Sequence, residues 1–444
     1  MPIFQRTFSH IRSAFARLSA GRPDRKLQLI AITGSQGKTI VAHTIYSILS
    51  KSQQAVGLIS TDGAWAYDEL VSTELSANSM TAKDFFNQLK KLYDMGIEIV
   101  VVETCADTIR EGVFKGVTFA AGVLTNIAGG EFLESYRHQT DYAETVFQPI
   151  TQIAAEGLAV INADDDSISW VRQRAESIKQ NIYAALCSTS QAEDWQKSLS
   201  GMTFKFEGGF FQTSLIGSFN LENLLLAIKL ASKYVSIDQI DRALSDFKGV
   251  PGRMQVLQTD PLTVIVDYGY QPMVIEKVIQ DIKEITPSES KLLIVLGAAG
   301  KRSQQRRYVA RVALKHARAI ILAPLDPRNE DVARINSDIF RHAEELNAVL
   351  VERVSAHDEY KALDSTNLSS KLERVTKNGD VPIVAFDENS PVGRADAVEF
   401  ALHLAQPGDT VLISGKGNDD VLDFGRAVYE WNDPNITREL LAAK

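Results

Sequence analysis

The chain has 444 residues, 45% of them hydrophobic, and a formal net charge of −9 at pH 7. At ~150 residues per domain this length predicts two or three domains with buried cores. The acidic balance disfavours a nucleic-acid partner bound through a general basic surface. The cysteines Cys105 and Cys187 are too few for a disulfide framework or a cysteine-built zinc site. No apolar run approaches the ~18 residues of a membrane-spanning helix, and we expect a globular protein of the reducing cytoplasm.

The first 26 residues differ from the rest in their charge and pattern. Apolar side chains recur at spacings of four and three, at Phe4, Phe8, Ile11, Phe15 and Leu18. Arginines occupy other faces of this helical pattern, and no acidic residue precedes Asp24. A basic amphipathic helix is typical of peripheral membrane contact, here through residues 1–22, or of an organelle-targeting segment. The interpretation we prefer is a helix packed on the body of the protein or on a partner.

A strand, a glycine-bounded turn and a helix follow one another between residues 27 and 49. The turn reads Thr33, Gly34, Ser35, Gln36, Gly37, Lys38 and Thr39. Glycines let successive backbone N–H groups face a polyphosphate, with the positive end of the helix behind them. Lys38 would reach the outer phosphates, and the Thr39 hydroxyl would hold Mg²⁺. We therefore predict a nucleotide-binding loop, with an ordinary strand-to-helix turn as the alternative.

From residue 27 to about 248, apolar strands alternate with helical segments, as in a mainly parallel sheet. The apolar strand at residues 97–102 runs into Glu103. A carboxylate at the end of a buried strand is costly unless it is satisfied, and such strand ends form the ligand crevice of doubly wound sheets. Glu103 is therefore a candidate Mg²⁺ ligand, and a solvated acid is the alternative. The alternation at residues 205–215 predicts a hairpin that turns at Gly208 and Gly209.

Glycine and proline interrupt the helical pattern at residues 249–253 and indicate a domain boundary. Beyond it, strands are predicted at residues 263–266, 292–296, 319–322, 382–386 and 410–413. Helices between these strands are typical of an open, Rossmann-like α/β domain. Because their ends are polar or rich in glycine, we expect a cleft between the domains. The predicted parts are a basic segment at 1–26, a central domain at 27–248 and a second domain at 249–444.

Nine segments occur in an order that resembles the Mur ligase family. They are ITGSQGKT, VVET, LTNI, VINADDD, GSFNLENLLLAI, GVPGRM, VIVDYGYQP, DPRNED and VLISGKGND. These ATP-dependent enzymes join an amino acid to a nucleotide-linked peptide in peptidoglycan synthesis. The likeness is greatest to the branch that adds the third residue of the stem peptide, the UDP-N-acetylmuramyl-tripeptide synthetases. The resemblance implies an α/β protein with a central P-loop ATPase-like domain and a C-terminal Rossmann-like domain.

The resemblance implies ATP and Mg²⁺ as cofactors and assigns residues to them. The ATP phosphates would be bound by the loop residues 33–39, and the metal by Thr39 and Glu103. The remaining nucleotide contacts would come from Asn220 near the adenine and from Arg253 and Asp267. Lys38, Glu103 and Arg253 would act in catalysis.

The resemblance also implies a site for the incoming amino acid. Asp326 and Arg328 lie in a segment similar to the branch's DNPR motif, and Lys416 and Asp419 lie in one similar to GKGHE. Arg328 would bind the amino acid's carboxylate, because a guanidinium fork suits a planar carboxylate. The family reaction makes an acyl phosphate from a substrate carboxylate and ATP, and an amine then displaces phosphate. Positioning and cations that neutralise phosphate charge dominate such chemistry.

The chain departs from the family pattern in its metal-binding segments. The histidine of the family's DHLD segment is missing after Asn126, and no lysine occurs between Lys115 and Lys179. The carbamylated lysine that binds a second Mg²⁺ therefore cannot form near Thr145 and Val146. Alternative ligands are Glu131, Glu134 and His138, and a solvated acidic loop is the other interpretation.

Three further departures concern the substrates. The histidine of DYAHTP is replaced by Tyr270, and the asparagine of DNPR is replaced by Asp326. Only about 26 residues precede the phosphate strand, too few for the family's uridine-binding domain. Three hypotheses follow: an active ligase that extends a peptidoglycan-precursor peptide by one amino acid, a weakened relative that acts as a nucleotide-binding regulator or scaffold, and a ligase of poly-γ-glutamate type.

Overall fold

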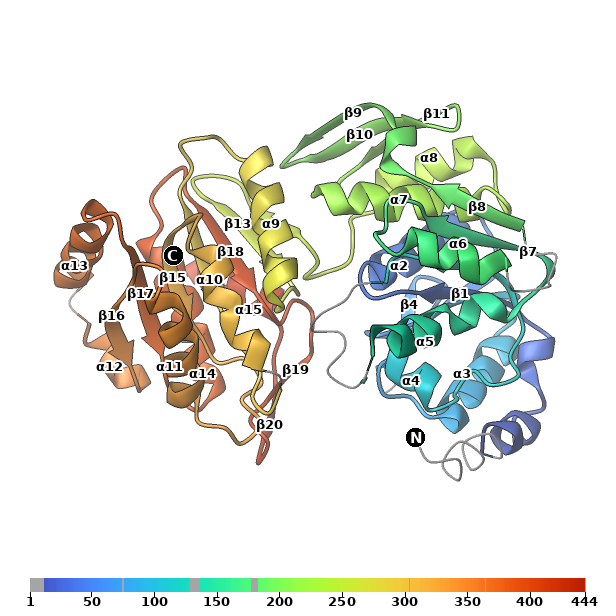
Figure 1. Ribbon diagram of the computed structural model, residues 1–444, viewed down its shortest axis with the longest axis horizontal. Helices are drawn as coiled ribbons and strands as arrows, with labels where there is room; N and C mark the ends of the chain where they lie inside the picture. The colour runs from blue at the N-terminus through green and yellow to red at the C-terminus, as the bar shows by residue number, and fades with distance from the viewer. Residues whose placement is uncertain are drawn as a thin grey trace. The chain divides into compact units, whose positions relative to one another are not determined.

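The computed structural model describes residues 12–73, 76–127, 136, 138–176, 183–302, 304–363 and 365–443. The chain divides into two compact units, Met1–Val250 (unit 1) and Pro251–Lys444 (unit 2). Each unit is an α/β structure built on its own large sheet (Figure 1). No helix in the described part of the chain is both long enough and apolar enough to cross a membrane.

Unit 1 contains an eight-stranded sheet among its described residues, in the order β4-β3-β2-β5-β1-β6-β7-β8. Its strands are Gln28–Thr33 (β1), Val56–Ser60 (β2), Gly63–Ala66 (β3), Glu69–Ser72 (β4), Ile99–Glu103 (β5), Phe119–Leu124 (β6), Ile153–Asn162 (β7) and Tyr183–Cys187 (β8). A separate three-stranded sheet consists of Glu193–Ser198 (β9), Gly201–Phe206 (β10) and Gly209–Thr213 (β11). Strand β3 is antiparallel to both of its neighbours, β2 and β4, and the other neighbouring pairs are parallel. This confirms the mainly parallel sheet.

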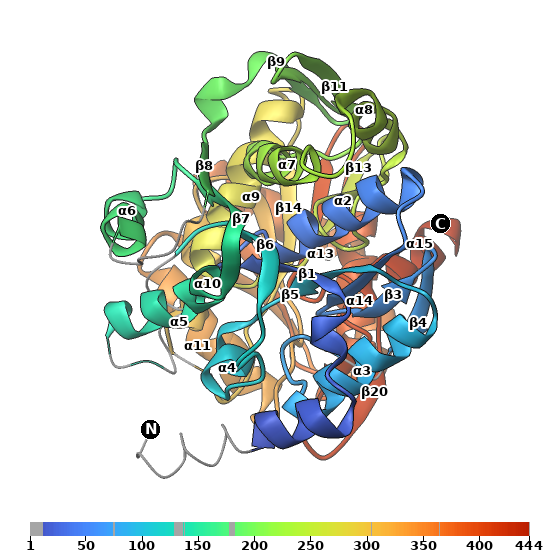
Figure 2. The same ribbon diagram turned by 90° about the vertical axis from the view of Figure 1, so that its right-hand side faces the viewer.

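Helices cover both faces of the unit 1 sheet (Figure 2). They are Lys38–Lys51 (α2), Ala82–Asp94 (α3), Ala106–Arg110 (α4), Gln139–Thr151 (α5), Ile168–Glu176 (α6), Ser218–Ala231 (α7) and Ile237–Asp246 (α8). Successive residues of a strand point to opposite faces. Accordingly, Ile30 and Ile32 of β1 pack with α2, α7 and α8, whereas Leu29 and Ala31 pack with α3, α4 and α5. The start of α2 is thereby held at the carboxyl end of β1.

Residues 12–19 form a helix that contacts unit 1 through small side chains. The buried side chains here are those of Ser13 and Ala16 in the helix and of Ala20 just after it. Phe15 and Leu18 are 73% and 54% exposed. The helix therefore packs on the body of the protein, but this described part of its apolar stripe faces away from the core. Residues 1–11 lie outside the described residues.

Unit 2 contains a seven-stranded sheet among its described residues, in the order β12-β13-β18-β14-β15-β17-β16. Its strands are Gln255–Gln258 (β12), Thr263–Asp267 (β13), Leu292–Leu296 (β14), Ala317–Leu322 (β15), Ala348–Val354 (β16), Val381–Phe386 (β17) and Thr410–Ser414 (β18). Only β12 is antiparallel to its neighbour. The five predicted strands are present, and the sequence pattern missed β12 and β16 at the two edges. Residues of both edge strands are partly exposed, and polar residues interrupt both: β12 begins and ends with glutamine, and β16 carries Glu352 and Arg353 after four apolar residues.

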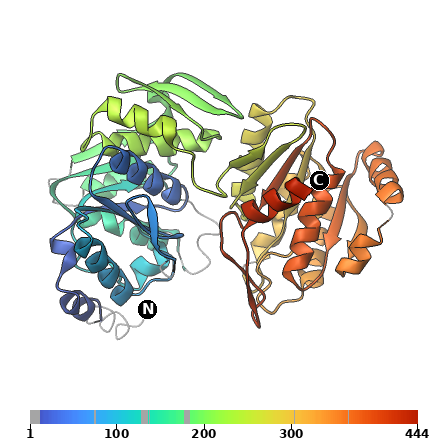
Figure 3. The same ribbon diagram turned by 180° about the vertical axis from the view of Figure 1, so that it is seen from behind.

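The helices of unit 2 are Pro272–Ile285 (α9), Val309–Ala313 (α10), Val332–Glu344 (α11), His357–Lys361 (α12), Ser365–Lys377 (α13), Pro391–Leu404 (α14) and Asp433–Ala443 (α15). A small hairpin consists of Val421–Asp423 (β19) and Val428–Glu430 (β20). Helix α10 packs against α9 and α11 on the face of the sheet seen in Figure 1. Helices α14 and α15 lie on the opposite face, seen from behind in Figure 3. The strand ends between these layers carry the predicted site residues of this unit.

Candidate functional site

The turn between β1 and α2 is built on two glycines that approach other residues too closely for a side chain. Gly34 has φ 139°, and a Cβ on it would lie 1.9 Å from Thr125 Oγ1. Gly37 has φ 79°, and a Cβ there would lie 2.2 Å from Asn223 Oδ1. Positive φ and close approach are both conditions that glycine alone meets cheaply. The tight turn expected from the spacing is therefore present in unit 1.

Two residues at the end of β6 fix the shape of this loop. Thr125 Oγ1 donates to the Gln36 carbonyl at 2.6 Å. Asn126 accepts at Oδ1 from Gln36 N at 3.0 Å, and its carbonyl accepts from Ser35 N at 3.0 Å. The amides of Ser35 and Gln36 are thus bonded within the loop, and those of residues 37–39 are the ones at the helix start. In the sequence, Thr125 and Asn126 belong to the LTNI segment, and no pattern there predicts their contacts with this loop.

Lys38 contacts this loop directly, and Asn220 contacts it through Asn223. Lys38 Nζ donates to the Ser35 carbonyl at 3.2 Å, so its ammonium lies over the turn. Asn220 is 1% exposed, donates to the Ile216 carbonyl at 2.7 Å and accepts from Asn223 Nδ2 at 3.2 Å. Asn223 then reaches Gly37, so α7 buttresses the loop through this pair of asparagines. The contact of Asn220 with adenine stays a prediction.

Thr39 and Glu103 come together where α2 begins and β5 ends. Thr39 Oγ1 donates to Glu103 Oε1 at 3.0 Å, and Ser60 Oγ donates to Glu103 Oε2 at 2.6 Å. Glu103 is 1% exposed, and Thr61 N also donates to Oε2, at 3.3 Å. The alternative of a solvated strand-end acid is therefore wrong. A buried carboxylate beside a hydroxyl at the predicted phosphate loop supplies hard oxygen ligands that fit Mg²⁺.

The rest of a Mg²⁺ coordination sphere would come from phosphates and water. Among the described residues, no group of three or more histidine, cysteine, aspartate or glutamate side chains could hold a metal ion. Mg²⁺ in nucleotide sites is typically held by one or two carboxylates plus substrate phosphates. One carboxylate at Glu103 and one hydroxyl at Thr39 agree with that arrangement.

The structure also shows what occupies the segment where the family lysine is missing. Thr145 Oγ1 donates to the Asp141 carbonyl at 2.8 Å, and Val146 is a core residue at 1% exposure. His138 is exposed and precedes α5. Glu131 and Glu134 lie outside the described residues.

We expect Glu103→Gln to raise the Mg²⁺ concentration needed for nucleotide binding by at least roughly tenfold. Glutamine keeps the shape and can still accept from Ser60 and Thr61, but it removes the negative charge that attracts the cation. Calorimetric ATP titrations at a series of Mg²⁺ concentrations measure this shift. Glu98→Gln, at the exposed position just before β5, is the matched control. A Mg²⁺ dependence equal to that of the wild type would remove Glu103 from the metal site.

In unit 2, Asp267 and Arg253 lie beside a partly buried tyrosine, Tyr268. Asp267 ends β13 and accepts from Met254 N at 2.8 Å and Gly269 N at 2.7 Å. Burial raises the pKa of Asp267, and its two backbone donors and Arg253 oppose that rise. The Arg253 guanidinium lies 3.8 Å from the centroid of the Tyr268 ring. The Arg253 Nε atom is buried, and within the described residues it has no hydrogen-bond partner.

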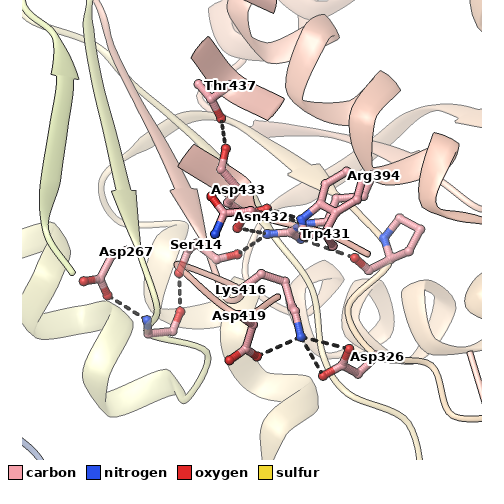
Figure 4. A network of polar contacts seen from close by, with 12 residues as sticks. Asp267, Asp326, Arg394, Ser414, Lys416, Asp419, Trp431, Asn432, Asp433 and Thr437 are labelled. Atoms are coloured by element: carbon pink, nitrogen blue, oxygen red, sulfur yellow. Dashed lines mark hydrogen bonds and ion pairs between the residues drawn. The ribbon is translucent and has the colours of Figure 1, made fainter. Parts of the chain in front are cut away.

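Three of the four predicted amino-acid residues, Asp326, Lys416 and Asp419, form one polar cluster in unit 2 (Figure 4). Lys416 is 1% exposed, and its Nζ donates to both carboxylate oxygens of Asp326 at 3.1 Å and to Asp419 Oδ2 at 2.8 Å. Asp326 Oδ1 also accepts from Asp423 N at 2.9 Å. The carboxylate that replaces the family asparagine is therefore neutralised by Lys416. Asp423, in the β19 hairpin, was not predicted from the sequence.

Arg328 lies at the edge of this cluster in a strained segment. Its guanidinium is 3.4 Å from Asp423 Oδ2 and 3.7 Å from Asp326 Oδ2, and its side chain is 29% exposed. Asp326, Arg328 and Asn329 have φ of 43°, 51° and 65°. Left-handed backbone at non-glycine residues costs free energy and concentrates at functional sites. Hydrogen bonds from Arg328 N and Asn329 N to the Asp423 and Phe424 carbonyls hold the segment in place.

The loops that carry Arg253 and Lys416 touch through glycines. A Cβ on Gly252 would lie 2.3 Å from Asn418 N, and one on Gly417 would lie 2.6 Å from the Gly252 carbonyl oxygen. Both glycines have positive φ. The predicted nucleotide side and amino-acid side of unit 2 are therefore adjacent.

Comparison with known proteins identifies the family. Residues 32–231 match the Mur ligase middle domain, and residues 252–385 match the Mur ligase glutamate ligase domain. The chain belongs to the Mur ligase family. It is accordingly an ATP-dependent, ADP-forming amide ligase that uses Mg²⁺, and the family, fold class and cofactors inferred from the sequence are confirmed.

Relatives of known function align with nearly the whole of this chain. The UDP-N-acetylmuramoyl-L-alanyl-D-glutamate--2,6-diaminopimelate ligase of Aquifex aeolicus is 28% identical over 427 residues, covering 95% of this chain and 79% of that protein. The ligase of the same name from Trichormus variabilis is 27% identical, covering 97% and 80%.

Solved structures show the same fold. A UDP-N-acetylmuramoyl-L-alanyl-D-glutamate--2,6-diaminopimelate ligase superposes with a TM-score of 0.61 at 22% identity, covering 98% of this chain and 83% of that one. Mycobacterium tuberculosis folylpolyglutamate synthase, complexed with ADP and AMPPCP, gives a TM-score of 0.65 at 15% identity, covering 91% and 92%. At these identities the likeness concerns the fold alone.

Proposed function

We propose that the protein adds an amino acid to a peptidoglycan-precursor peptide in the cytoplasm, using ATP and Mg²⁺ and releasing ADP. The observation that supports this substrate class is the cluster in unit 2, where the partly exposed Arg328 adjoins the buried Lys416 and Asp326. A guanidinium at a strained strand-end loop suits the carboxylate of an amino acid. The diaminopimelate named for the curated relatives is one such amino acid.

The reaction divides into two balanced steps. A carboxylate oxygen of the acceptor peptide attacks the γ-phosphorus of ATP, so that an acyl phosphate forms and ADP leaves. The amine of the amino acid then attacks the acyl carbon, the bond to phosphate breaks, and an amide, phosphate and a proton result. A bound Mg²⁺ neutralises charge on the transferred phosphoryl group.

Residues of this chain contribute orientation and charge to that chemistry. The amides at residues 37–39 and the Lys38 ammonium bind phosphate oxygens, because the helix start concentrates positive potential there. Arg253, stacked on Tyr268, supplies a second cation for the nucleotide. Arg328 holds the amino acid by its carboxylate, so that its amine is the group left to react.

The test is ADP release with Mg²⁺-ATP, a UDP-muramyl dipeptide and a panel of diamino and acidic amino acids, with mass spectrometry of the products. A new amide formed together with ADP supports the proposal and names the amino acid. ATP binding without turnover for any acceptor would contradict it. That outcome would instead favour a nucleotide-binding regulator, in keeping with Thr145 and Val146 where the family has a carbamylated lysine.

We also propose that the N-terminal helix contacts an anionic membrane surface. Phe15 and Leu18 are exposed on the described helix, and the pattern of Phe4, Phe8 and Ile11 continues the same stripe in the sequence. The first 23 residues contain four arginines and no acidic residue, in a chain whose net charge is −9. A basic segment with exposed apolar side chains suits negatively charged lipid headgroups.

We expect the fraction of the double variant Phe15→Ser/Leu18→Ser that sediments with phosphatidylglycerol vesicles to be roughly tenfold lower than that of the wild type. Each substitution removes an apolar side chain that would leave water on binding, and neither side chain contributes to the core. Phe210→Ser, at a position 53% exposed on β11, serves as the control. Equal sedimentation of the double variant and the wild type would contradict membrane contact. A wild type that self-associates and does not bind vesicles would also contradict it.

A further inference from the structure

A fully buried ion pair joins two helices on one face of the unit 2 sheet. Arg394 of α14 donates through Nε to Asp433 Oδ1 at 2.9 Å and through its NH2 group to Asp433 Oδ2 at 2.7 Å. Both side chains are 0% exposed. Trp431 Nε1 also donates to Asp433 Oδ1, at 2.7 Å, and Thr437 Oγ1 donates to the Asp433 carbonyl at 2.7 Å. The start of α15 is therefore tied to α14.

The remaining donors of Arg394 reach two backbone carbonyls at the ends of neighbouring segments (Figure 4). Its NH1 group donates to the Pro324 carbonyl at 3.2 Å, and its NH2 group donates to the Ser414 carbonyl at 3.1 Å. Pro324 precedes Asp326 by two residues, and Ser414 precedes Lys416 by two residues. One guanidinium thus holds both chain segments whose side chains meet in the Asp326–Lys416 contact.

Hydrogen bonds also link the segment that Arg394 holds at Ser414 to Asp267, a predicted nucleotide-binding residue. Ser414 Oγ donates to the Gly269 carbonyl, and Gly269 N donates to Asp267 Oδ1 at 2.7 Å. Gly415 N donates to the Asp267 carbonyl at 3.0 Å. The Ser414 backbone that Arg394 holds is therefore bonded to the strand end that carries Asp267.

The energetics of burial favour a role in geometry for this pair. Two charges removed from water lose much hydration, so a buried ion pair contributes little to stability compared with apolar residues of similar volume. A planar fork that binds a carboxylate on one side and two carbonyls on the other fixes distances and angles. Catalytic and binding groups need exactly such support from residues behind them.

We propose that Arg394 and Asp433 are positioning residues of the amino-acid site, and that they set the spacing between Asp326 and Lys416. This inference rests on the proposed substrate site. It also assigns the last helix of the chain, α15, a part in that site, although α15 supplies none of the predicted substrate residues.

The double variant Arg394→Met/Asp433→Leu tests this role, because it removes both charges and refills the volume with apolar atoms. The single variant Asp433→Asn keeps the shape and is the second test. We expect the amino-acid KM to rise roughly 10- to 100-fold in the folded double variant, with the ATP KM within about twofold of the wild type. Circular dichroism and thermal unfolding establish that each variant is folded.

The matched control is Arg318→Met. Pro324 follows β15 and Ser414 ends β18, and this variant breaks a bond near the opposite ends of β15 and β18. Arg318 lies in β15, and its NH1 group donates to Asp409 Oδ2 at 2.7 Å, just before β18. We expect this variant to lose stability without a change in the amino-acid KM. An unchanged amino-acid KM in the folded double variant, or an equal rise in the control, would overturn the proposal.

A second readout does not need turnover. Lys416 is buried and paired with two carboxylates, so it should react slowly with an amine-acetylating reagent. Mass spectrometry measures the rate at which Lys416 is acetylated. We expect faster acetylation of Lys416 in the Arg394 and Asp433 variants than in the Arg318→Met control. Equal rates would overturn the positioning role. A wild type that makes no amide would refute the proposed function, and the acetylation rates would still decide this inference.

Discussion

Replacing Lys38 with alanine should weaken binding of Mg²⁺-ATP by roughly 100-fold, the effect of losing hydrogen bonds to a charged group. The Lys38 ammonium lies over the loop, and its Ser35 contact is one that phosphate oxygens can replace. Alanine suits a helix, so α2 should keep its start. Isothermal titration calorimetry of the purified chain measures the affinity directly.

Lys51→Ala is the matched control for that experiment. Lys51 ends the same helix and pairs with Asp246 at 3.6 Å, far along α2 from the loop. We expect its ATP affinity to equal that of the wild type. An unchanged affinity of the Lys38→Ala protein would show that the turn is an ordinary connection between a strand and a helix.

Arg328→Ala should raise the amino-acid KM by roughly 100-fold and leave the affinity for ATP unchanged. The guanidinium is partly exposed and only loosely paired with Asp423 and Asp326, so it is available to a ligand carboxylate. Lysine at this position should restore little, because a single ammonium cannot reproduce the two parallel bonds of the fork. Steady-state kinetics with each substrate varied in turn separates the two effects.

The control for Arg328 is Arg334→Ala on α11, where the side chain is exposed. Its kinetics should match those of the wild type. Loss of ATP affinity and amino-acid affinity together in Arg328→Ala would indicate that the residue supports the fold of the strained segment, which holds three left-handed residues. Thermal unfolding would then show a matching loss of stability.

The predicted residues whose local geometry the structure bears out are those with local sequence signals. The two glycines of the phosphate loop have the spacing that close backbone approach requires, and the structure shows the atoms that would collide with a side chain there. Glu103 was predicted as a metal ligand because a carboxylate that ends a buried strand needs partners, and its burial and hydrogen bonds show that it has them. The partners Ser60 and Thr39 lie 43 and 64 residues away.

The parts that were missed depend on contacts between distant segments. Asn126 braces a loop 90 residues earlier, and no periodicity or spacing records that pairing. Asp423 approaches Asp326 because a short hairpin folds back toward the strand ends. The helix at residues 12–19 shows another limit of prediction from the sequence. The small side chains of Ser13, Ala16 and Ala20 allow close packing and are buried, whereas the larger apolar side chains of Phe15 and Leu18 are exposed. Close packing between elements decides such choices, and a pattern of residue types does not contain it.

The contact between Gly252 and Gly417 has a consequence for the order in which ligands act on unit 2. Neither loop can shift without displacing the other, because their backbones meet where any side chain would collide. A nucleotide that reorients Arg253 should therefore alter the affinity for the amino acid near Lys416. By thermodynamic reciprocity, the amino acid must change the affinity for the nucleotide by the same factor. The two substrates would then bind with heterotropic cooperativity generated inside a single folded unit.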